Sequence, residues 1–189
     1  MPITSFLHRI AAVLLFATGG TAPAAEPAAT DDPCNFHASE PLLQRGVYED
    51  HRYTERDNDN ATETARLAAN VKLKIVSVGC VDSSARTYTL TYPAAALPDR
   101  TLAQWADVAR RELDGLSYLD GAKDSVRDTV AFAGSVAASQ ASGDKFVRCA
   151  DDSTPPDGDC AWSTGGRHAI EVRRARGAIE VILEESSSR

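Results

Sequence analysis

Four carboxylates lie in one short segment of the chain. Residues 149–160 read Cys-Ala-Asp-Asp-Ser-Thr-Pro-Pro-Asp-Gly-Asp-Cys, with a cysteine at each end. A loop closed at its base loses less conformational entropy when it docks, and clustered carboxylates favour a cationic partner. The sequence therefore predicts an acidic binding loop. The alternative is a solvated surface loop in which the prolines and glycine only make turns. The candidate binding residues are Asp151, Asp152, Asp157 and Asp159.

The cysteines indicate the redox compartment. The chain has four of them, Cys34, Cys80, Cys149 and Cys160. An even number is typical of disulfides in an oxidising compartment. Of the three pairings, we favour Cys34 with Cys80 and Cys149 with Cys160, because the second pair closes a short loop rich in turn residues. A metal site or redox dithiol is the alternative, but neither C-x-x-C nor zinc-finger spacing occurs.

Other residues with reactive side chains form no catalytic motif. His37, His51 and His168 each stand alone, and His51, surrounded by local carboxylates, is interpreted as a strand-surface histidine. The segment Ser142–Lys145 matches S-x-x-K without the S-D-N or K-T-G partners and is better interpreted as a helix stop. The acidic runs lack calcium-loop spacing. We therefore predict no catalytic residue, no metal and no cofactor, and whether the protein is an enzyme stays open.

The N-terminal residues have the order of a secretory signal. Arg9 is followed by an apolar run over residues 10–17 and by small residues that end in an A-x-A pattern at Ala22–Ala24. This predicts a removable signal over residues 1–24 and a periplasmic or secreted protein. The apolar run is too short to span a bilayer, so no membrane anchor is expected. Cys34 follows a polar stretch, which disfavours a lipid anchor.

The charge of the chain limits its partners. The formal net charge is −7, and loss of Arg9 with the signal makes the mature chain more acidic. Nucleic acid and anionic membranes bind clustered Lys and Arg, so neither is expected as a partner. The charge instead favours a cationic protein of the envelope or the secreted medium.

Two groups of three strand-like segments flank two helix-like segments. Residues 47–56, 70–79 and 86–92 have strand character, the last two as a hairpin, and residues 145–149, 168–174 and 178–183 follow later. Between them, residues 101–115 have helical periodicity with a Thr101/Gln104 capping box. A second helix is predicted from Ser125, capped with Asp128, whose inner face carries Val126, Val130, Ala133 and Ala137.

This order predicts a single α+β domain over residues 45–185, in which two helices cover one face of a mainly antiparallel sheet stapled by two disulfides. A mobile leader is expected over residues 25–44 and a frayed tail over residues 186–189. The leading functional hypothesis is an inhibitor, an immunity-type protein or an accessory protein that binds through the acidic loop. The alternatives are a hydrolase with a dispersed carboxylate site and a carrier of a small ligand.

Overall fold

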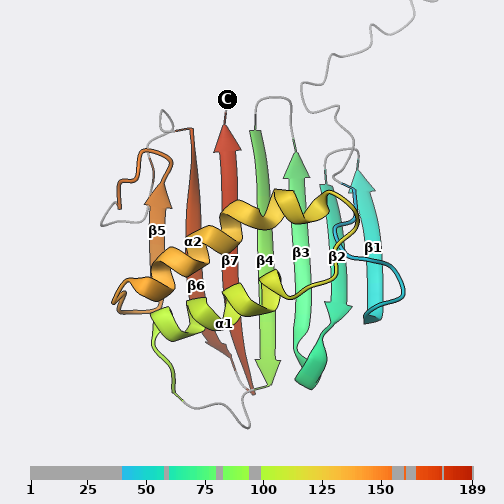
Figure 1. Cartoon of the computed structure of the whole chain (residues 1–189), viewed down its shortest axis with the longest axis horizontal. Helices are drawn as coiled ribbons and strands as arrows, with labels where there is room; N and C mark the ends of the chain where they lie inside the picture. The colour runs from blue at the N-terminus through green and yellow to red at the C-terminus, as the bar shows by residue number, and fades with distance from the viewer. Residues whose placement is uncertain are drawn as a thin grey trace, which may run out of the picture. The chain divides into compact units, whose positions relative to one another are not determined.

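The computed structural model describes residues 40–57, 60–79, 83–93, 99–154, 160, 165–175 and 177–188. Within them, seven strands form one sheet and two α-helices lie together on one of its faces (Figure 1). This agrees with the predicted α+β class and antiparallel sheet. The predicted signal, Cys34, Cys80 and the predicted Cys34–Cys80 disulfide lie outside the described residues.

Strand pairing is antiparallel throughout, in the order β1-β2-β3-β4-β7-β6-β5. Figure 1 shows the C-terminal strand β7 inside the sheet, between β6 and β4. The two halves of the chain therefore meet inside one sheet. The strands are β1 (Glu49–Asp57), β2 (Asn60–Arg66), β3 (Lys72–Gly79), β4 (Ser83–Pro93), β5 (Lys145–Cys149), β6 (Gly166–Ala175) and β7 (Ala178–Ser188).

Strand β1 forms one edge of the sheet and is irregular. Its pairing with β2 shifts register between Glu49 and Arg52 and again between Glu55 and Asp57. Asp50, inside the first irregularity, has a φ of 53°, in the left-handed region that a non-glycine residue seldom adopts. Such bulges change which side chains face inward.

The first helix, α1 (Leu102–Asp114), begins where the sequence predicts. Thr101 Oγ1 accepts a hydrogen bond from the Gln104 N–H at 3.3 Å, and Gln104 Oε1 accepts one from the Thr101 N–H at 2.9 Å. This reciprocal pair satisfies two backbone donors that the helix itself cannot. The apolar stripe of α1 packs on the sheet and consists of Leu102, Trp105, Ala106, Ala109 and Leu113.

The second helix, α2 (Arg127–Ala138), begins differently from the prediction. Ser125 lies in a preceding 3₁₀ turn (Ala122–Val126), and its hydroxyl donates to the Ala122 carbonyl, so it does not cap α2. The buried face also differs, because Val130 and Ala137 are only half-buried. The fully or nearly fully buried residues near and along α2 are Val126, Thr129, Phe132, Ala133 and Val136.

Both ends of the predicted domain are more ordered than expected. The leader prediction is wrong for Leu42 and Leu43, which are 6% and 0% exposed and belong to the core. Leu43 also forms an isolated bridge with Tyr118. The tail prediction is wrong up to Ser188, because β7 continues there and pairs residues 186–188 with residues 83–85 of β4.

Candidate functional site

The acidic loop begins at the end of the edge strand β5, where a disulfide closes its base. Cys149 is bonded to Cys160 with their Cα atoms 5.5 Å apart, so the predicted pairing of these two cysteines is confirmed. Cys149 itself is buried. Of the four predicted binding residues, Asp157 and Asp159 lie outside the described residues, whereas Asp151 and Asp152 lie within them.

Backbone hydrogen bonds fold residues 149–153 into a compact turn. The Asp152 N–H donates to the Cys149 carbonyl at 3.0 Å, and the Cys149 N–H donates to the Ser153 carbonyl at 2.9 Å. The Ser153 N–H also donates to Asp151 Oδ1 at 3.0 Å. Asp152 has a φ of 63°, which Asp tolerates better than most residues. The turn is therefore fixed by its own polar groups.

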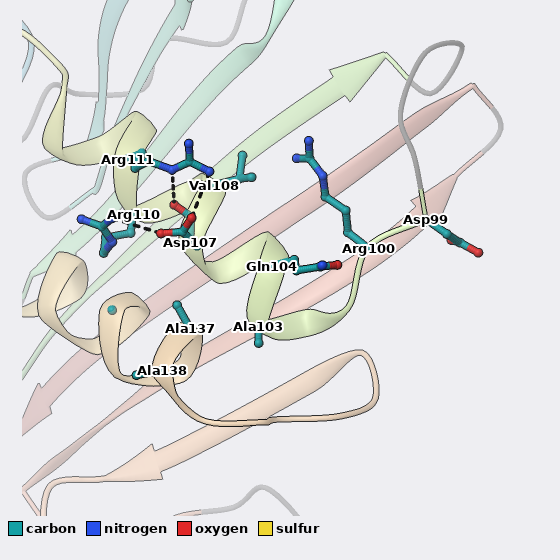
Figure 2. A pocket seen from close by; sticks show the side chains of 11 residues that line it. Asp99, Arg100, Ala103, Gln104, Asp107, Val108, Arg110, Arg111, Ala137 and Ala138 are labelled. Carbon is teal, nitrogen blue, oxygen red and sulfur yellow. Dashed lines mark hydrogen bonds and ion pairs between the residues drawn. The ribbon is translucent and has the colours of Figure 1, made fainter.

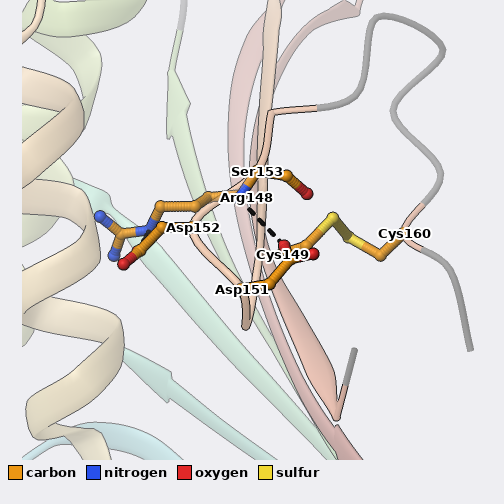
Figure 3. The surroundings of a disulfide bond; sticks show 6 residues. All are labelled: Arg148, Cys149, Asp151, Asp152, Ser153 and Cys160. Atoms are coloured by element: carbon orange, nitrogen blue, oxygen red, sulfur yellow. Dashed lines mark hydrogen bonds and ion pairs between the residues drawn. A yellow bond between two sulfur atoms is a disulfide. The ribbon is translucent and has the colours of Figure 1, made fainter. Parts of the chain in front are cut away.

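Figure 3 shows how the two carboxylates are presented: Asp152 lies beside the Arg148 guanidinium, while Asp151 lies on the side of the disulfide. The Arg148–Asp152 distance is 3.9 Å, and the Asp152 side chain remains 91% exposed. Hydrogen bonds from Ser153 hold the pKa of Asp151 below its usual range. Asp151 is thus negatively charged at every pH near neutrality.

The base of the loop is held to the rest of the molecule by Arg148. Its guanidinium lies over the Phe132 ring of α2, 5.2 Å from the ring centroid, and donates to Ser135 Oγ at 3.2 Å. Behind it, β5 pairs with β6 over its whole length, and the Ala150 N–H donates to the Gly166 carbonyl. The loop is therefore clasped by a disulfide, a strand pairing and a cation–π contact.

The structure corrects the interpretation of His51. Its side chain is only 9% exposed, and its Nε2 lies 2.7 Å from Glu63 Oε1 on the neighbouring strand β2. The predicted surface histidine is therefore largely buried. Sequence reasoning missed Glu63 because only the β1–β2 pairing brings these residues together. Tyr53 pairs in register with Glu63, and His51, two residues before Tyr53, lies on the same face of the sheet as Glu63.

Glu63 has a structural role that accounts for its burial. Its two carboxylate oxygens accept hydrogen bonds from the Leu42 N–H at 2.8 Å and from the Leu43 N–H at 3.1 Å. With His51 as the third donor, the carboxylate has its hydrogen bonds satisfied, and it fixes residues 42 and 43 against the sheet. A hollow of about 520 Å³ lies beside it, lined by Arg45, Gly46, Tyr48, Asp50, His51 and Tyr53.

The remaining predicted residues stay apart from one another. Ser142 precedes β5 and Lys145 is its first residue, and both are exposed. Within the C-terminal hairpin, Arg167 pairs with Glu184 and Arg173 pairs with Glu171. In the described ranges, no group of three or more His, Cys, Asp or Glu is arranged to hold a metal ion. None of the described helices has the length and apolarity needed to cross a membrane.

Comparison with known proteins adds no relative to this picture. No protein-family model, no curated protein and no solved structure matches the chain.

Proposed function

We propose that this protein is an exported protein-binding module that engages a cationic partner through the acidic loop. The partner would be an envelope or secreted protein, and the module would act as an inhibitor, an immunity-type protein or an accessory protein. One observation carries the proposal: the turn at residues 149–153 is fixed at its base, yet its two carboxylates are exposed. A fixed loop loses little entropy on binding, and exposed carboxylates complement basic residues.

The position of the loop favours a protein as the partner. The loop follows an edge strand, and among the described residues β5 has no strand neighbour on the side away from β6. A basic partner that binds Asp151 and Asp152 can also contact this edge. The acidic net charge accelerates the encounter with a cationic protein, and salt should reduce that effect.

The test removes the charges without changing the turn. Asp151→Asn with Asp152→Asn keeps the Oδ1 acceptor and suits the left-handed conformation at residue 152. A partner is isolated with the mature protein from the envelope fraction and purified, and its Kd is measured for each variant. We expect this double variant to bind at least about tenfold more weakly, with a smaller salt dependence.

The matched control is Glu55→Gln with Asp120→Asn, which removes the same charge at two exposed positions away from the loop. We expect it to change the Kd less than about twofold, because only the long-range charge term is altered. If both double variants bind equally, the effect comes from net charge. If neither differs from the wild type, the acidic-loop proposal is wrong.

A further inference from the structure

A groove of about 720 Å³ runs between the outer surfaces of α1 and α2. Figure 2 shows its arginines extending from α1 and from the short segment that leads into it, with Ala137 and Ala138 on the facing helix. This groove is separate from the acidic loop, and its charge has the opposite sign. Its lining includes Arg100, Arg110 and Arg111 together with the small residues Ala103 and Gly134.

The arginines outnumber the acids that neutralise them. Asp107 is shared by two of them, at 3.0 Å from Arg110 and 2.9 Å from Arg111. Hydrogen bonding from these arginines, chiefly Arg110, holds the pKa of Asp107 below its usual range. The other acid of the groove, Asp99, is paired with Arg174 of β6 at 3.3 Å. The groove therefore has a positive excess in an acidic protein.

Arg100 is held ready to bind an anion. Its guanidinium lies 5.0 Å from the centroid of the Trp105 ring, a residue that is 1% exposed and thus fixed in the core. Among the ion pairs of the described residues, none involves Arg100. A cation stacked on a fixed ring loses less side-chain entropy when it binds a carboxylate.

The floor of the groove permits close approach by a peptide backbone. Ala103, Gly134 and Ala137 have short or absent side chains, and Arg110 lies directly across Gly134. A Cβ at position 134 would come within 3.2 Å of Arg110 Cδ, which is tighter than an ordinary contact. The absence of a side chain at Gly134 therefore leaves room for the Arg110 side chain in the groove.

We propose that the groove between α1 and α2 binds an acidic peptide segment of a partner protein, with Arg100, Arg110 and Arg111 as its carboxylate-binding residues. The planar guanidinium fork matches a carboxylate in two parallel hydrogen bonds. A long polyanion fits less well, because the net charge of −7 repels a ligand that extends beyond the groove. A short acidic segment meets only the local positive charge.

The test uses a short fluorescein-labelled peptide rich in Asp and Glu, with fluorescence anisotropy as the measure of binding to the full mature chain. The comparison ligands are the same peptide with Asn and Gln in place of the acids, and a sulfated oligosaccharide of similar length. We expect only the acidic peptide to bind, with chemical-shift changes confined to the amides of α1 and α2.

Two variants with opposite expected effects test the residues. Arg110→Gln with Arg111→Gln should weaken peptide binding about tenfold or more, since two charge-assisted contacts are lost. Asp107→Asn should strengthen binding, because it releases both arginines from their shared carboxylate. The matched control, Arg52→Gln with Arg56→Gln on the edge strand β1, should leave the affinity within about twofold.

Three results would overturn the proposal. They are no binding of the acidic peptide, an equal loss of peptide affinity in the groove variant and the control arginine variant, or tighter binding of the oligosaccharide than of the peptide. Thermal unfolding of each variant shows whether the fold is intact, and Asp107→Asn remains informative if the double arginine variant is unstable. Neutralising Asp151 and Asp152 should not weaken peptide binding, so this test is independent of the acidic-loop proposal.

Discussion

A row of polar side chains crosses the sheet beneath α2, and His168 lies within it. Its neighbours in register are Glu185 on β7 and Arg148 on β5. Glu185 also binds Arg86 at 3.3 Å and accepts a hydrogen bond from Thr129. The His168 ring lies 5.3 Å from the Phe132 ring. The imidazole is thus placed between ion-paired groups and an aromatic surface.

Burial, the largest influence, lowers the pKa of His168 below its ordinary value of 6.5; Arg148 lowers it further, whereas Glu185 and Asp128 oppose the shift. The folded protein therefore binds a proton less readily at this site than the unfolded chain. We therefore expect the protein to have its full stability above about pH 6.5 and to lose stability as the pH falls below that value. Because the ring is only partly buried, the free energy of unfolding should fall by less than about 1.4 kcal/mol per pH unit.

Urea unfolding of the wild type and of His168→Gln between pH 5 and pH 8 measures this effect, since roughly this range brackets the ordinary histidine pKa. The variant should lose part of the stability decline below pH 6.5 and change little above it. Identical pH slopes for the two proteins would contradict the assignment.

At the scale of elements, the helix starts show what local sequence can and cannot determine. The Thr101/Gln104 capping box involves residues three apart, so the sequence alone predicted it correctly. The start of α2 depends on a preceding 3₁₀ turn, which places the Ser125 hydroxyl against the Ala122 carbonyl. The same kind of motif therefore predicted one helix start and missed the other.

Two alanine substitutions test whether Thr101 caps α1 and whether Ser125 caps α2. Thr101→Ala removes a working cap and should lower the free energy of unfolding by about 1 kcal/mol. Ser125→Ala removes no cap, and we expect a change within about 0.5 kcal/mol. Chemical unfolding in parallel compares the two. Equal losses would mean that Ser125 does cap α2.

At the scale of the whole molecule, much of the fold could be predicted from local patterns, whereas the site could be predicted only in part. The alternation of apolar and polar residues over 70–79 and 86–92 predicted β3 and β4, and the spacing of the cysteines predicted the Cys149–Cys160 disulfide. The His51–Glu63 pair depends on the register between β1 and β2, and the arginine groove depends on how two helices pack. Neither arrangement leaves a signal in contiguous residues.

Leu42 and Leu43, which the sequence placed in the predicted leader, are part of the core, so truncating them should reduce stability. Leu43 is fully buried, so Leu43→Ala should lower the free energy of unfolding by about 2 to 5 kcal/mol. Val47→Ala is the control, because Val47 is 50% exposed and should contribute little. Urea unfolding of the full chain measures both. A loss below about 0.5 kcal/mol for Leu43→Ala would show that the segment is dispensable.

The irregular edge strand β1 bears on how copies of the protein behave when concentrated. A flat, regular edge offers a row of backbone groups on which another chain can grow a fibril. Here two register shifts, a left-handed Asp50 and many charged side chains interrupt that row. Edge-to-edge polymerisation through β1 is therefore disfavoured.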